Sequence, residues 1–90
     1  MKRTIELDPS RLQERREAHE YLQQVFQFDS SYGHNLDALK DSLSEVSDDC
    51  DLVFTHDAVE QILEEPYAYR ILTVLGSAAC ENPHLHILFR

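Results

Sequence analysis

Acidic side chains at a four-residue spacing are the residues of this chain best suited to recognise another molecule. Asp37, Asp41 and Glu45 follow one another at that interval, so they share one face if the segment is helical. Like charges at this spacing destabilise a helix, and helix stability therefore does not account for them. A carboxylate on a rigid helix can accept paired hydrogen bonds from arginine or occupy the place of a phosphate. The spacing predicts a surface for a cationic group; the alternative is that the acids only solvate the helix.

The residues around these acids predict the helix that positions them. Asn35 can cap a helix, because its side-chain oxygen accepts an otherwise unpaired amide hydrogen of the first turn. Gly33 removes a side chain just before this cap, as a turn or the close approach of another chain requires. An apolar stripe that faces a core follows the cap; it consists of Leu36, Leu39, Leu43 and Val46.

Magnesium chemistry is an alternative use of the carboxylates, and the sequence gives it little support. The candidate ligands are Asp37, Asp41, Asp48 and Asp49. The chain has only two glycines and lacks a glycine-rich loop that would hold phosphates. No Ser-His-Asp or Cys-His arrangement fits a nucleophilic site. We therefore predict that the protein is not an enzyme and needs no cofactor or metal.

The cysteines and the C-terminal histidines offer a second metal alternative. His84 and His86 share one face of a predicted strand, and Cys80 precedes them, but a second ligand pair for zinc is missing. Cys50 is the other cysteine, and a disulfide with Cys80 is geometrically possible, because parallel strands bring these ends to one edge. In a cytoplasmic chain we expect two reduced thiols instead. His19, beside an apolar stripe, is predicted to be a hydrogen-bonded core histidine.

Composition limits the class of partner. The chain has 90 residues, which predicts a single domain over 1–90, and 17 acidic against 8 basic residues give a net charge of −9. This balance argues against nucleic acid, which is bound through basic patches, and favours a basic protein partner. No apolar run approaches a membrane span. Met1-Lys2-Arg3 leads directly into a predicted strand without a signal-peptide core, so we expect a cytoplasmic protein. We also expect it to be monomeric when free.

Hydrophobic periodicity predicts the remaining elements. Strands are expected near 4–7, 51–55 and 85–89, and the apolar centre of the second suggests cover on both faces. One helix is predicted from Asp8-Pro9-Ser10 to about Phe26, one after Asn35, a short one from about His56 and another from Pro66 to Asn82-Pro83. Asparagine is expected to end this last helix in a left-handed conformation. Three strands separated by helical segments predict an α/β fold, with a parallel sheet packed with about four helices.

The stretch Tyr32-Gly33-x-Asn35-Leu36-Asp37-Ala38-Leu39-x-Asp41-x-Leu43 resembles the signature of the barstar family, small intracellular inhibitors of secreted bacterial ribonucleases. The resemblance implies the same fold, a small three-stranded parallel sheet packed with helices. It also implies a stoichiometric inhibitor, or immunity protein, that blocks a basic ribonuclease cleft with its acidic helix and the preceding loop. The alternative is a non-catalytic interaction module on the same fold that binds another basic protein.

The resemblance also assigns residues to the contact with the partner. Asp41 matches the acidic position expected to contribute most, and Asp37 matches a second acidic contact. Three positions depart from the family pattern, since Ser31 replaces a common tyrosine, Lys40 an aromatic residue and Ser77 a frequent glutamate. Lys40 and Ser77 predict weaker binding than is usual in the family, because the positive charge of Lys40 would oppose docking against a basic partner and Ser77 lacks the charge of the glutamate. The expected contact residues are Ser31, Tyr32, Gly33, Asn35, Leu36, Asp37, Lys40, Asp41 and Ser77.

Overall fold

The computed structural model describes residues 2–90 and contains three strands and four α-helices in these residues. The elements are β1 (Arg3–Glu6), a short 3₁₀ turn η1 (Pro9–Arg11), α1 (Arg15–Phe26), α2 (Leu36–Ser44), β2 (Cys50–Phe54), α3 (His56–Glu64), α4 (Pro66–Glu81) and β3 (Leu85–Phe89). The predicted strands lie within one residue of the observed ones. The α/β class and the number of helices are confirmed.

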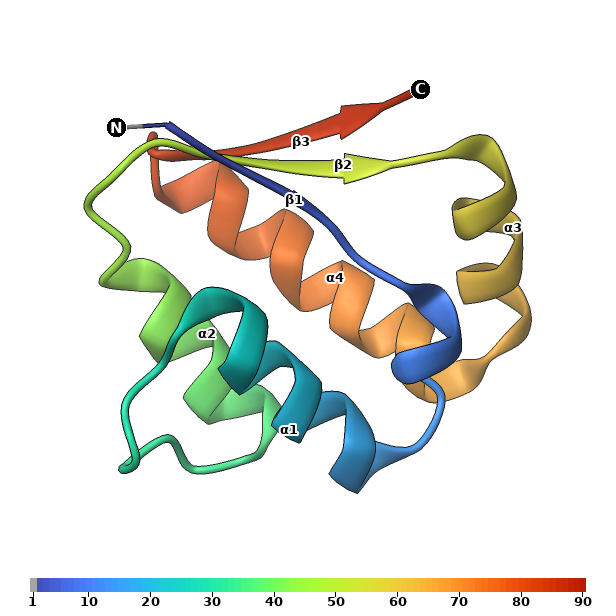
Figure 1. The fold of residues 1–90 in the computed structure, drawn as a ribbon, viewed down its shortest axis with the longest axis horizontal. Helices are drawn as coiled ribbons and strands as arrows, with labels where there is room; N and C mark the ends of the chain where they lie inside the picture. Colours follow the sequence, from blue (N-terminus) through green and yellow to red (C-terminus); the bar gives the residue numbers. More distant parts are fainter. Residues whose placement is uncertain (1) are drawn as a thin grey trace.

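The three strands form a parallel sheet in the order β1-β2-β3. Ile5 pairs with Leu52, which in turn pairs with Ile87. Helices follow β1 and β2 along the chain, because parallel neighbours require a long crossover rather than a hairpin. Figure 1 shows the helices gathered on one side of the sheet, with α4 running beneath it and α1 and α2 farther from the strands. This arrangement confirms the predicted parallel sheet.

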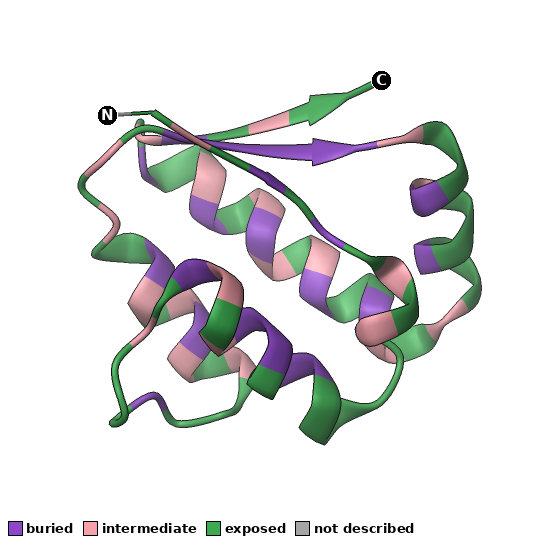
Figure 2. Ribbon diagram, in the orientation of Figure 1, coloured by how far each residue is buried: buried purple, intermediate pink, exposed green. Residues whose placement is uncertain are grey.

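The central strand β2 is buried at every position, which confirms the expected cover on both of its faces (Figure 2). On the face without helices, Asp51 is covered by neighbouring side chains. Its carboxylate lies 2.9 Å from Lys2 Nζ and 3.1 Å from His86 Nδ1. The hydrogen bond from Lys2 lowers the pKa of the Asp51 carboxyl. A buried carboxylate is retained here because two cationic or hydrogen-bonding groups compensate its charge.

The predicted helix from residue 8 to 26 is in fact two elements. Asp8 Oδ1 accepts a hydrogen bond from the Ser10 amide at 3.0 Å, and this cap supports only the η1 turn. The backbone is extended again at Glu14 (φ −109°, ψ 134°), whose side chain accepts hydrogen bonds from two amides of the first turn of α1. Leu12, between the two elements, is buried. The chain therefore bends to place this leucine in the core before α1 begins.

Asn82 joins the end of α4 to the end of α2. The helix α4 ends at this residue as predicted, but the backbone of Asn82 is extended (φ −114°, ψ 110°) and not left-handed. Its side-chain Nδ2 donates to the carbonyl oxygens of Leu43 at 2.9 Å and Val46 at 3.0 Å. These carbonyls lie at the C-terminal end of α2, where a helix leaves acceptors without an internal donor. The buried side chain of Asn82 thus completes the last turn of α2 from another element.

Candidate protein-binding surface

The start of α2 is fixed by Asn35, as the sequence predicts. Its Oδ1 accepts a hydrogen bond from the Ala38 amide at 2.7 Å, and its Nδ2 donates to the Gly33 carbonyl at 3.2 Å. A Cβ added to Gly33 would lie 3.1 Å from Ala38 Cβ. The absence of a side chain at Gly33 therefore allows the loop to pass close to the first turn of α2. The φ of Gly33 is not positive; the left-handed residue of this turn is His34, at φ 52°.

The entry loop, residues 27–35, is held by hydrogen bonds from its own side chains and from α1. Gln23 Nε2 donates to the Asp29 carbonyl at 2.8 Å, while Gln23 Oε1 lies 2.8 Å from His34 Nε2. Asp29 accepts hydrogen bonds from the Ser31 hydroxyl and amide, and these bonds lower the pKa of its carboxyl. The hydroxyl of Ser31 is therefore engaged within the loop. A loop ordered in this way loses little conformational freedom when a partner binds.

A buried histidine anchors the same loop from beneath. His19 is fully buried, with its Nδ1 2.7 Å from the Tyr32 hydroxyl and its Nε2 2.6 Å from the Tyr67 hydroxyl. This arrangement confirms the expected hydrogen-bonded core histidine and links α1, the entry loop and the first turn of α4. Burial lowers the pKa of His19 and raises that of Tyr32. The Tyr32 side chain is buried, so it supports the loop from the core and does not project from it.

The acidic residues of α2 lie on its solvent side. Asp37, Asp41 and Glu45 are exposed, which confirms the predicted orientation. Within residues 2–90, none of the three forms an ion pair. The helix therefore presents negative charges that its own protein does not neutralise. Exposed carboxylates without a partner retain their charge for a cationic group that comes from outside.

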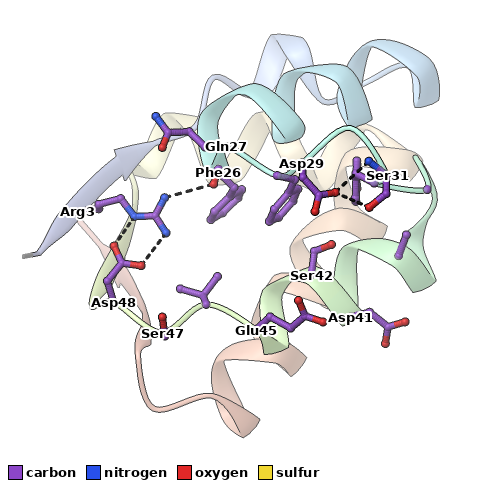
Figure 3. A pocket seen from close by; sticks show the side chains of 15 residues that line it. Arg3, Phe26, Gln27, Asp29, Ser31, Asp41, Ser42, Glu45, Ser47 and Asp48 are labelled. Carbon is purple, nitrogen blue, oxygen red and sulfur yellow. Dashed lines mark hydrogen bonds and ion pairs between the residues drawn. The ribbon is translucent and has the colours of Figure 1, made fainter.

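A groove of about 510 Å³ runs between the entry loop and α2 (Figure 3). The rings of Phe26 and Phe28 contribute to its lining and stack with their centroids 5.3 Å apart. Arg3 and Asp48 form an ion pair at one end, with 2.8 Å between Nε and Oδ2. Asp41 lines the opposite end in Figure 3. Among the predicted contact residues, this groove brings together Ser31, Tyr32, Gly33 and Asp41.

The other predicted residues of the signature lie elsewhere around α2. Asn35, Leu36 and Asp37 line a smaller hollow at the start of the helix, together with side chains of α1 and α4. Leu36 is only partly buried and packs against the core. Seven of the nine expected contact residues thus line two depressions, and the other two, Lys40 and Ser77, line neither.

Lys40 faces α4 and not the groove. Its Nζ lies 2.7 Å from a carboxylate oxygen of Glu81, and this hydrogen bond lowers the pKa of the Glu81 carboxyl. Ser77, one helical turn before Glu81 on α4, is exposed and also acts to lower that pKa. Sequence reasoning missed Glu81, although the four-residue spacing after Ser77 was a usable signal. The positive charge expected to oppose docking at Lys40 is therefore balanced by a neighbouring carboxylate.

Four of the candidate metal ligands, Asp48, Asp49, His84 and His86, are engaged in other contacts. His84 Nδ1 lies 3.2 Å from Asp49, and Asp48 pairs with Arg3. In the described part of the chain, the one cluster of three residues close enough to share an ion is exposed at the start of α3. It consists of His56, Asp57 and Glu60, which sequence reasoning did not single out. Both cysteines are free thiols, with Cys50 buried and Cys80 exposed.

A comparison with models of known protein families identifies the family of this chain. The family model for Barstar, described as a barnase inhibitor, matches residues 2–89. The chain belongs to the barstar family. This is a family of ribonuclease inhibitors rather than of enzymes, and the match confirms the resemblance seen in the signature. No curated protein matches the chain, and none of the helices described in residues 2–90 has the length and apolar character of a membrane span.

Proposed function

We propose that this chain is a stoichiometric inhibitor of a small secreted bacterial ribonuclease and acts inside the cell that makes it. The enzyme's active site must bind phosphates, so it is a cleft rich in arginine and lysine. The α2 face and the entry loop would fill that cleft and exclude RNA. Asp41 would take the position of a substrate phosphate and accept hydrogen bonds from arginine, and Asp37 would supply a second anionic contact one turn away.

The observation that carries this proposal is the state of the carboxylates on α2. Asp37, Asp41 and Glu45 are exposed and have no cationic partner within residues 2–90. They stand on a helix whose start is capped by Asn35 and whose last turn is completed by Asn82. Charges held in place before binding lose little freedom when they meet a partner. The net charge of −9 also favours rapid association with a basic protein.

The proposal is tested by titrating ribonuclease activity. A panel of small secreted bacterial ribonucleases, barnase among them, is assayed on RNA with increasing amounts of the protein. We expect activity of at least one enzyme to fall linearly and to vanish at one inhibitor per enzyme. Tight binding without loss of activity would instead support the alternative, an interaction module for another basic protein. Activity unaffected at a large excess of the protein, across the whole panel, would overturn the inhibitor proposal.

A further inference from the structure

Two arginines without carboxylate partners meet at the start of α2. Arg15 comes from α1 and Arg70 from α4, and both are exposed. They line the same open hollow of about 250 Å³, which we call the arginine hollow. Its lining consists of Arg15, Asn35, Leu36, Asp37, Tyr67 and Arg70.

The charge distribution of the protein makes this pair unusual. Acidic residues outnumber basic ones by 17 to 8, so a carboxylate is available to most cations. Ion pairs with carboxylates are formed by Lys2, Arg3, Arg11, Arg16 and Lys40. Within residues 2–90 no such pair is formed by Arg15, Arg70 or Arg90. Two of these three arginines, Arg15 and Arg70, line the same hollow.

Tyr67 lines the hollow together with the two arginines. Its hydroxyl lies 2.6 Å from His19 Nε2 of α1. Burial raises the pKa of this hydroxyl, while the charges of Arg15 and Arg70 both act to lower it. Both arginines therefore act on the same side chain of the hollow. Two like charges that share one hollow repel each other, and an anion from outside would reduce that repulsion.

We propose that the arginine hollow binds a single aspartate or glutamate side chain of the protein that meets the acidic face of α2. This inference rests on the proposed function, since it adds a second contact to the same interface. Asp37 also lines the hollow, so two positive charges and one negative charge leave room for one further negative charge. A dianionic phosphate or an RNA strand would meet repulsion from Asp37 and from the net charge of −9.

The proposal defines the kind of surface that the partner must present. Asp41 lies one helical turn beyond Asp37, about 6 Å along the axis. The partner therefore needs cationic groups opposite Asp41 and a carboxylate at the rim of that basic cleft, on the side of α1 and α4. Such alternating charges discriminate between partners more strongly than a uniformly acidic surface does, because wrong pairings bring like charges together.

Charge reversal tests the proposal against simple attraction of opposite net charges. Affinity for a ribonuclease that the wild type inhibits is measured by calorimetry for Arg15→Glu, Arg70→Glu and Arg90→Glu. Each change makes the inhibitor more acidic, so net charge alone predicts tighter binding to a basic enzyme in all three. We expect Arg15→Glu and Arg70→Glu to weaken binding about tenfold or more, and Arg90→Glu, at the end of β3, to leave it unchanged or tighter. Tighter binding by Arg70→Glu would overturn the proposal.

A second measurement does not depend on the ribonuclease. The Nε–Hε NMR signals of Arg15 and Arg70 are followed in the free protein while blocked aspartate, with its single carboxylate, or inorganic phosphate is added. We expect both signals to shift saturably with blocked aspartate, and the Arg90 signal to show no saturation. If these two signals saturate with phosphate but not with blocked aspartate, or if neither compound saturates them, the carboxylate assignment is wrong. If no ribonuclease is inhibited, the proposed function fails, while this titration still decides the chemistry of the hollow.

Discussion

The imidazole Nδ1 of His19 lies 2.7 Å from the hydroxyl of Tyr32, so a fully buried side chain of α1 holds the loop that leads into α2. Because the other ring nitrogen contacts the Tyr67 hydroxyl, one side chain connects α1, the entry loop and α4. A neutral imidazole can accept from one tyrosine and donate to the other. The neutral form is therefore matched to this site, and protonation would place a charge in the core.

This relationship predicts how stability depends on pH. Burial, the charge of His34 and that of Arg15 lower the pKa of His19 below its ordinary value. The unfolded chain thus binds the proton more readily, and the stabilisation by neutral His19 is complete above about pH 6.5. It is lost progressively as the pH falls from there toward the lower pKa of the folded state. We expect the free energy of unfolding, measured by urea denaturation, to decline from pH 7 to pH 5.

His19→Gln should remove this part of the pH dependence and lower stability at pH 7 by about 1–3 kcal/mol, since buried hydroxyl groups lose a partner. The control is His56→Gln, which alters an exposed histidine of α3 and should retain the wild-type slope. An unchanged slope in His19→Gln would assign the pH dependence to other groups.

Asn35 makes two hydrogen bonds whose effects can be separated. Asn35→Ala removes the cap of α2 and the tether to Gly33, and we expect a loss of about 1 kcal/mol in the free energy of unfolding. Asn35→Asp keeps an acceptor for the Ala38 amide but loses the donor to the Gly33 carbonyl. It should retain most of the stability in denaturant titrations. A loss in Asn35→Asp as large as that in Asn35→Ala would show that the tether, and not the cap, stabilises this region.

Asp41→Ala should separate binding from stability. Alanine favours the helix, and the repulsion with Asp37 and Glu45 is relieved, so the thermal midpoint should stay unchanged or rise slightly. Affinity for an inhibited ribonuclease should fall by about 2–5 kcal/mol, a range taken from complexes that include members of this family. Glu64→Ala is the matched control, because Glu64 is an exposed acid in the last turn of α3. Equal losses in both variants would reduce the role of Asp41 to general charge.

Breaking the Lys40–Glu81 ion pair from either side should change the affinity for a basic partner in opposite directions. Lys40→Met leaves the Glu81 carboxylate free for a basic partner, and we expect tighter binding. Glu81→Gln leaves Lys40 without its anion, and we expect weaker binding. Both should change stability by less than about 1 kcal/mol, because the Glu81 side chain is exposed and that of Lys40 is partly exposed. Calorimetry of the two variants side by side provides the test, and a change of the same sign in both would contradict it.

The sequence predicted the elements whose signals are local. The cap at Asn35, the strand positions and the exposure of Asp37 and Asp41 follow from residue type and spacing, and the structure confirms them. The break before α1 was missed, because Leu12, Gln13 and Glu14 are compatible with a helix. What decides the conformation there is the burial of Leu12 and a cap formed by Glu14, a residue type not expected to cap.

The contacts that join distant segments were also beyond sequence reasoning. Tyr67 is separated from His19 by 48 positions, and nothing near either residue signals the pair. The arginine hollow depends likewise on how α1 and α4 lie beside α2. Periodicity shows which side of a helix is apolar, but it does not show which polar residues of two other helices will meet.

The bond from Asn82 to the end of α2 has a consequence for the synthesis of the protein. The carbonyl groups of Leu43 and Val46 receive their donor from a residue 39 and 36 positions later. While the ribosome is still adding α4, α2 has neither that donor nor the helix against which it packs. We therefore expect the acidic face to become ordered only after Asn82 has left the ribosomal tunnel.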